Sequence, residues 1–274
     1  MANASASYDG TVTGSLAELR RQVCETNRAL ATHGLVTLSW GHVSGYDRER
    51  GLVVIKPTHV SHHDLRPEHM VVVDMDGVVV EGTLRPALDT PTHLTLYRSL
   101  VGIAGIAHTH SPYATMFAQA RLEIPCLGST HAEHFCGPVP VTRPLSVAET
   151  EADYERNTGR VIIERLDGLS PDIVPAVLVA GRGPFVWGDS SNAALSTAVA
   201  LEAVARVAFG TIQLRQRAVP LEGHVLEAHY QRMQASRSGP GAPGAKTLPL
   251  PGMGVGQSDC VRATRSRRVP PDEG

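Results

Sequence analysis

Two histidines separated by one residue, His108 and His110, follow a short apolar run that ends at Ala107. Alternate residues of a β-strand face the same side of a sheet, so both imidazoles can reach one metal ion. Asp89 offers a carboxylate upstream, although an aspartate before a helix is more commonly an N-cap. The histidines could instead be the exposed polar end of a strand. Arg182 lies downstream; as a cation it cannot coordinate a metal ion, so the identity of a further ligand stays open.

The elements around these residues follow from local patterns. Ser15 and Glu18 form a capping box at the start of an apolar helical repeat that Gly34 ends. Asp76-Gly77 between two β-branched runs predicts a hairpin over 70–80. Further helices are predicted over 90–100, from Ser111 onward, over 147–166 with a break at Gly159, and over 191–206. Further strands are predicted over 35–40, 52–57, 103–110 and 175–180. This mixture of helices and strands indicates an α/β layered domain.

Composition sets limits on function. The chain has 274 residues and a formal net charge of −2, which gives no electrostatic basis for binding nucleic acid. No apolar run approaches the roughly 18 residues that span a bilayer, and the first residues lack the charged-then-apolar order of a signal peptide. We therefore expect a cytoplasmic protein with neither a membrane nor a nucleic-acid partner.

The domain organisation is predicted to be simple. A flexible N-terminus over 1–13 precedes one domain over 14–234. The last segment, 235–274, is rich in glycine and proline and is expected to be disordered.

Several blocks in the chain resemble the class II aldolase/adducin superfamily, and most closely its L-ribulose-5-phosphate 4-epimerases. The matching blocks are 35–41, 47–51, Val54-Ile55-Lys56-Pro57, Asp89-Thr90-Pro91-Thr92-His93, His108-Thr109-His110-Ser111 and 183–188. The resemblance covers about residues 15–230. It implies a class II aldolase-like layered domain with a mixed or antiparallel central sheet flanked by helices. It also implies a homotetramer with active sites at subunit interfaces.

The departures from that family concern its substrate site. His42 replaces an asparagine, Thr58-His59 replaces a Ser-Gly pair, and Ala87-Leu88 replaces a Ser-Ser pair. Ala87 and Leu88 cannot donate side-chain hydrogen bonds to a phosphate, and each lost charge-assisted bond costs about 1.5–3 kcal/mol. Glu133 stands where the family has a catalytic aspartate, and Arg182 stands where it has a third histidine ligand.

The resemblance, with these changes, implies a set of site residues. The metal ligands are Asp89, His108 and His110. The catalytic residues are Glu133, as an acid/base, a fourth ligand or a partner of Arg182, and Arg182, as an anchor for a substrate carboxylate. The substrate-binding residues are His42, Lys56, Thr58, His59, Leu88 and His131. Lys56 could also simply cover the surface, and Arg182 could face solvent.

Two histidines and one carboxylate form the facial triad of non-haem Fe(II) oxygenases. The leading hypothesis is therefore an Fe(II)- and O2-dependent oxidative decarboxylase that cleaves a C–C bond of an aromatic α-keto or α-hydroxy acid. It would be similar to the oxygenases of aminocoumarin antibiotic biosynthesis, which act on a prenylated 4-hydroxyphenylpyruvate and the corresponding mandelate.

Two alternatives remain. One is a Zn²⁺- or Mn²⁺-dependent aldolase or 4-epimerase that acts on a sugar or sugar phosphate by stabilising an enolate. The other is a non-catalytic binding module of the adducin type, which would have lost its metal ligands.

Overall fold

The computed structural model describes residues 12–237, and the predicted segments 1–13 and 235–274 lie almost wholly outside that range. Its centre is a seven-stranded sheet of order β4-β3-β2-β1-β5-β7-β6, in which every neighbouring pair of strands is antiparallel. The strands are β1 (His42–Asp47), β2 (Leu52–Ile55), β3 (Val71–Asp74), β4 (Val79–Glu81), β5 (Gly105–His108), β6 (Ala176–Val179) and β7 (Gly183–Gly188). The helices are α1 (Val12–Thr32), α2 (Thr90–Ser99), α3 (Pro112–Ala120), α4 (Ser129–His134), α5 (Val147–Arg165), α6 (Ser191–Leu214) and α7 (Gly223–Arg237), with a 3-10 turn over Pro67–His69.

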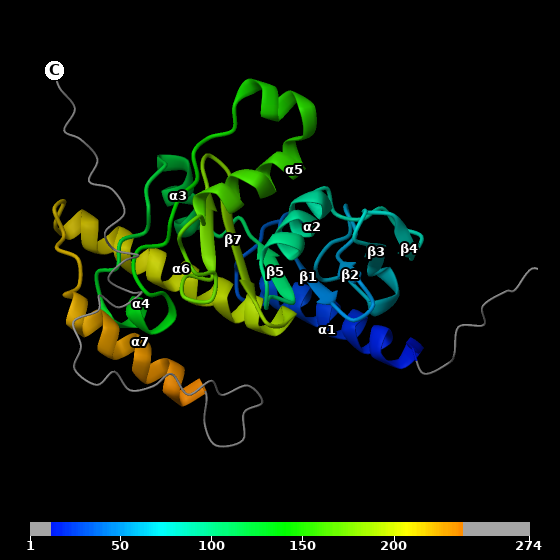
Figure 1. Ribbon diagram of the computed structural model, residues 1–274, viewed down its shortest axis with the longest axis horizontal. Helices are drawn as coiled ribbons and strands as arrows, with labels where there is room; N and C mark the ends of the chain where they lie inside the picture. The colour runs from blue at the N-terminus through cyan, green and yellow to red at the C-terminus, as the bar shows by residue number, and fades with distance from the viewer. Residues whose placement is uncertain (1–11, 238–274) are drawn as a thin grey trace, which may run out of the picture.

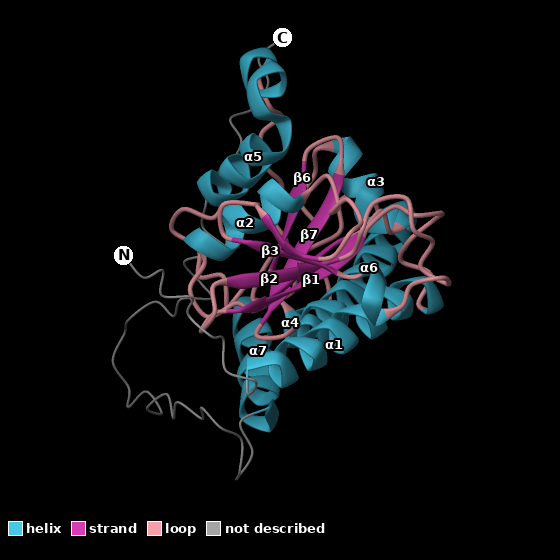
Figure 2. Cartoon of the chain, turned by 90° about the vertical axis from the view of Figure 1, so that its right-hand side faces the viewer, coloured by secondary structure: helices cyan, strands magenta, loops and turns pink. Residues whose placement is uncertain are grey.

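Helices cover both faces of this sheet (Figures 1 and 2). Strand residues alternate between the faces, so Val53 and Val73 pack toward α2 and α5 while Val54 and Val72 pack toward α1. Continuous β-branched runs suit strands that are buried on both sides. The predicted α/β layered arrangement is confirmed, and its sheet is antiparallel.

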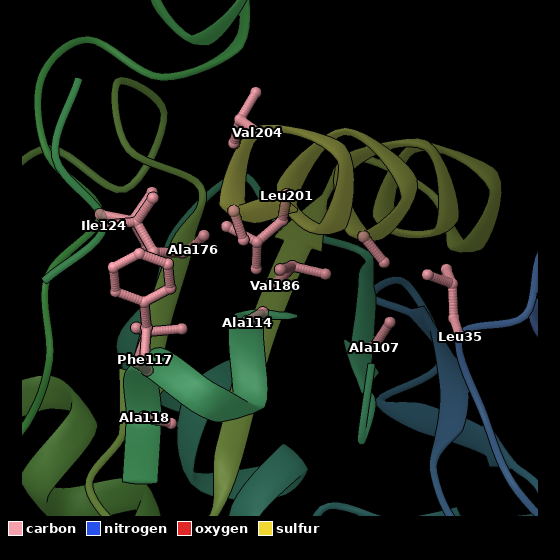
Figure 3. Close-up of a cluster of buried hydrophobic side chains, with 14 of the residues drawn as sticks. Leu35, Ala107, Ala114, Phe117, Ala118, Ile124, Ala176, Val186, Leu201 and Val204 are labelled. Carbon is pink, nitrogen blue, oxygen red and sulfur yellow. The ribbon is translucent and has the colours of Figure 1, made fainter. Parts of the chain in front are cut away.

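The largest core cluster lies between the sheet and α6 and α3. Phe117, Val186 and Leu201 pack there with smaller residues such as Ala107 of β5 (Figure 3). Because Ala107 faces this core, its neighbours Ile106 and His108 must face the opposite side, toward α2. The alternation therefore assigns His108 to the α2 face.

The strand predicted over 35–40 is wrong. Leu38 and Gly41 have left-handed φ values of 55° and 76°, so this segment turns and the strand begins only at His42. A side chain at Gly41 would come within 2.9 Å of the His108 carbonyl oxygen, so glycine permits the close approach of this turn to β5. As a result, His42 lies opposite His108 in the sheet.

Two helix details also differ from the prediction. The break in α5 falls at Asp153, with φ −163°, and Gly159 remains helical. A Cβ at Gly159 would lie 2.7 Å from the Thr95 Cβ, so this glycine serves close packing of α5 on α2. Helix α1 already includes Ser15 inside it, which overturns the predicted N-cap.

Helix α6 corrects the expectation about apolar runs. It extends eight residues beyond the predicted end at Arg206, and by length and composition it is the one described helix that could cross a membrane. One face of it, however, is buried in the core through Ala198, Leu201 and Ala205. Its Glu202 carboxylate also accepts hydrogen bonds from the backbone N–H groups of Tyr113 and Ala114.

Candidate metal and substrate site

His108 lies at the end of β5 with its ring stacked on Phe185, the centroids 4.2 Å apart. Its Nδ1 is 2.9 Å from the Pro184 carbonyl oxygen, which can only accept, so Nδ1 carries the proton and donates. Burial lowers the pKa of His108 well below its usual value, so the ring is neutral. Its Nε2 therefore presents a lone pair, and this buried atom has no hydrogen-bond partner in the described structure. A backbone-anchored imidazole with an open Nε2 is typical of a metal ligand.

His110 lies two residues beyond the end of β5, with its ring still on the side of His108, as the strand period predicts. Its ring centroid is 4.8 Å from that of His108, and it is partly exposed beside Trp40. Burial lowers the pKa of His110 too, which favours the neutral form that binds metals. The two imidazoles thus offer a pair of nitrogen donors of a kind that suits a divalent transition metal.

Asp89 occupies the N-cap position of α2, but its side chain makes no capping hydrogen bond. Instead, its Oδ1 accepts a hydrogen bond from Arg182 Nη2, and both side chains are largely buried. Burial by itself raises the pKa of Asp89, but the attraction of Arg182 and of the nearby His42 outweighs it and lowers that pKa below its usual value. Among the described residues, no three His, Cys, Asp or Glu side chains are grouped as they would be around a metal ion. Asp89 is thus paired with Arg182 and does not form a ligand group with His108 and His110.

His93 belongs to this site although the sequence analysis did not select it. It is one turn along α2 from Asp89 and fully buried, with its Nε2 3.1 Å from His42 Nε2. Its Nδ1 is 2.7 Å from Ser44 Oγ, which is in turn 2.7 Å from the Tyr97 hydroxyl. The spacing Asp89 to His93, i and i+4 on a helix that starts at Thr90-Pro91, was the signal that could have found it.

His42 connects this chain of polar groups to Asp89. Its Nε2 lies 3.9 Å from Asp89 Oδ2, and burial lowers its pKa to about 3. A neutral His42 and a neutral His93 can share one hydrogen between their Nε2 atoms. Of the predicted substrate-binding residues, His42 is therefore the one that lies against Asp89.

Lys56 directly follows β2 and does not cover the surface: only 2% of it is exposed. Its Nζ donates to the carbonyl oxygens of Pro57, at 3.2 Å, and Ser39, at 3.4 Å. No carboxylate of the described residues pairs with it, and burial lowers its pKa to about 8. A buried ammonium without a counter-ion is suited to bind an anion.

Thr58, His59 and Leu88 lie in two loops that pair with each other. Thr58 N donates to the Arg85 carbonyl and Ala87 N to the Lys56 carbonyl. His59 takes a left-handed φ of 61°, the conformation that suits a glycine at this position. Leu88 is 62% exposed and lines a hollow of about 300 Å³ that Asp89, His108 and His110 do not line.

Glu133 and His131 lie on α4, which packs against α7, at the other end of the molecule from α2 (Figure 1). Glu133 Oε1 is 3.5 Å from Nδ1 of His229 on α7, and His131 Nε2 donates to the Gly137 carbonyl at 2.8 Å. Within one chain, the structure therefore does not bring Glu133 to Arg182 or to the histidine pair.

Known proteins are similar to this chain in both sequence and fold. Residues 21–209 match the family described as the Class II Aldolase and Adducin N-terminal domain. L-ribulose-5-phosphate 4-epimerases from Salmonella paratyphi B and Salmonella typhi are 46% identical over 215 residues, 78% of this chain and 94% of each relative. The solved structure of an L-fuculose 1-phosphate aldolase, 22% identical, superposes with a TM-score of 0.68 over 80% of this chain and 97% of its own. The putative aldolase/epimerase/decarboxylase YgbL of Klebsiella pneumoniae, 24% identical, gives 0.62 over 78% and 98%.

These relatives contradict the leading hypothesis of the sequence analysis. An Fe(II)- and O2-dependent oxidative decarboxylase of antibiotic biosynthesis is wrong, because the chain is 46% identical to curated epimerases over nearly their whole length. The structure shows the physical weakness in that hypothesis: it took Arg182 as an anchor for a substrate carboxylate, whereas Arg182 binds Asp89, the carboxylate of the supposed triad.

The family match spans more than two thirds of the chain, and the arrangement of sheet and helices agrees with solved members. The protein therefore belongs to the class II aldolase/adducin family.

Proposed function

We propose that this protein is a divalent-metal-dependent 4-epimerase, acting by aldolase-type chemistry on a small sugar phosphate. The observation that carries the proposal is the 46% identity to L-ribulose-5-phosphate 4-epimerases over 94% of their length. The unpartnered, buried Nε2 of His108 supports it, because such an atom needs a ligand to offset its burial. A non-catalytic binding module of the adducin type, which lacks metal ligands, would not account for this buried nitrogen.

The proposed metal is Zn²⁺ or Mn²⁺, held by His108 and His110, with Asp89 as a carboxylate ligand once it is released from Arg182. Such an ion acts as a Lewis acid that polarises a substrate oxygen and stabilises negative charge as a C–C bond breaks. The protein's own part is to hold His108 in one tautomer through Pro184 and to keep both imidazoles neutral.

The proposed anchor for the substrate phosphate is Lys56, with the Thr58 hydroxyl beside it in sequence. The ammonium supplies the charge, which compensates for the missing side-chain donors at Ala87 and Leu88. His42, His59 and Leu88 would shape the remaining wall. This assignment predicts that Lys56, and not the 87–88 pair, dominates recognition of the phosphate.

Glu133 is proposed to act as the acid/base from a neighbouring subunit of a homotetramer. Its separation from the histidine pair within one chain supports this arrangement, and His229 Nδ1 lies 3.5 Å from its Oε1. His131 would support the α4 backbone through Gly137. We also propose a cytoplasmic location, where charged sugar phosphates are retained.

The direct test is to supply metal-loaded protein with L-ribulose 5-phosphate and follow formation of its C4 epimer by NMR. Unphosphorylated L-ribulose is the matched control, since it lacks only the group assigned to Lys56. The proposal predicts conversion of the phosphate ester and much slower conversion of the free sugar. No conversion of either compound, by protein shown to contain the metal, would contradict it.

A further inference from the structure

Arg182 is held from several directions in the turn between β6 and β7. Besides Asp89, its guanidinium contacts the Thr158 hydroxyl, with Nη1 to Oγ1 3.2 Å. It also lies over the rings of Tyr154 and Phe185, at 5.1 and 5.6 Å from their centroids. Asp89 is the one carboxylate paired with it in the described structure.

This arrangement holds a positive charge against Asp89, the carboxylate that would otherwise be available to a metal ion. A carboxylate oxygen that accepts from a guanidinium has its charge largely neutralised, and a divalent cation brought to it is repelled by the guanidinium. The pair is only 16% and 10% exposed, so solvent screens this competition little. Asp89 makes no capping hydrogen bond, and its second oxygen, Oδ2, lies 3.9 Å from His42 Nε2.

We infer that Arg182 is the resident counter-cation of Asp89 and competes with the divalent ion for it. While Arg182 is paired with Asp89, only the two histidines are available to the metal. Asp89 joins them when Arg182 releases it. Arg182 is thus a positioning residue that weakens metal binding, and not a ligand. The inference rests on the proposed function insofar as His108 and His110 are taken to bind the ion.

A double-mutant cycle in metal affinity tests this competition. Zn²⁺ affinity is measured by competition with a chromogenic chelator for the wild type, Arg182→Gln, Asp89→Asn and the double variant. We expect Arg182→Gln to bind Zn²⁺ about tenfold more tightly or better, as outer contacts of a ligand commonly change affinity by about 10–100-fold. Asp89→Asn should change affinity little in the wild type and cost about tenfold or more in the Arg182→Gln background. Arg182→Met, which also removes the charge, provides a second variant with the same expected gain in affinity should Arg182→Gln fold poorly.

Arg156→Gln is the matched control, because it removes an arginine of neighbouring α5 that pairs with Asp153 instead. It should leave Zn²⁺ affinity unchanged. Equal or weaker Zn²⁺ binding by Arg182→Gln, or the same effect of Asp89→Asn in both backgrounds, would overturn the inference while leaving the proposed epimerase intact. If neither the wild type nor Arg182→Gln binds Zn²⁺ or Mn²⁺, the metal site itself is wrong and both proposals fail.

Discussion

Lys56 illustrates how burial gives a single residue its chemistry. Its ammonium is buried without a described counter-ion, and this burial lowers its pKa from 10.5 to about 8 although it donates to two backbone carbonyls. The unfolded chain keeps the higher pKa and therefore binds more protons between pH 8 and 10.5. Folding stability from this residue consequently rises with pH across that window, while anion binding weakens over the same range.

The resulting prediction concerns substrate affinity. Above pH 8 the KM for the phosphorylated substrate should rise, by about tenfold at pH 9, because only about a tenth of Lys56 remains protonated. Lys56→Met should raise the KM at pH 7 and remove the inflection near pH 8. Steady-state kinetics between pH 6.5 and 9.5 measure both effects. A Lys56→Met enzyme that keeps the same inflection would show that another group is responsible.

At the scale of elements, the site depends on how closely α6 meets β5. A Cβ at Gly105 would lie 2.1 Å from the Ser190 carbonyl oxygen, at the N-cap of α6. Backbone cannot move aside as a side-chain tip can, so glycine is required where β5 passes the helix start.

Gly105→Ala should therefore destabilise the protein by about 2–3 kcal/mol or more, as over-packing does. Gly210 of α6 is the matched control, since a Cβ there meets nothing within 4 Å. Gly210→Ala should stabilise by about 0.5–1 kcal/mol, because alanine is the better helix former. Urea unfolding of both variants measures the difference; equal effects would contradict the packing account.

Elements that a short sequence motif marks were predicted from the sequence. Thr90-Pro91 marked the start of α2, Asp76-Gly77 the β3–β4 hairpin, and the period of two the shared direction of His108 and His110. Strand β1 was missed because its sequence, from His42 to Asp47, is largely polar and becomes buried only by the chain packed around it. The Arg182–Asp89 contact joins residues 93 positions apart, so no spacing rule could reveal it. Without that long-range pair in view, Asp89 was assigned to the metal and Arg182 to a substrate carboxylate.

The site proposed for the whole molecule involves more than one chain. His108, at the end of β5, and His110 just after it are separated from Glu133 on α4 within the chain, so the proposed site would be completed by a second subunit. A closed symmetric oligomer would repeat this interface identically at each site.

Mixing two inactive variants tests this arrangement. His108→Ala and Glu133→Gln should each be inactive alone, because each lacks one half of every site. Co-refolded in equal amounts, they should regain activity in about a quarter of the sites, where an intact His108 faces an intact Glu133. Light scattering should show a tetramer in each sample. A mixture that stays inactive although mixed tetramers form would contradict a shared site.

We propose that a divalent ion at His108 and His110 drives epimerisation of a sugar phosphate. It is tested most directly by adding Zn²⁺ or Mn²⁺ stepwise to metal-free protein while the C4 epimer of L-ribulose 5-phosphate is measured. We expect activity that rises with bound metal and saturates at about one ion per chain. It should be lost in His108→Ala and retained in His63→Ala, where the histidine is exposed. One bound ion per chain without any epimerisation, or full activity in His108→Ala, would contradict it.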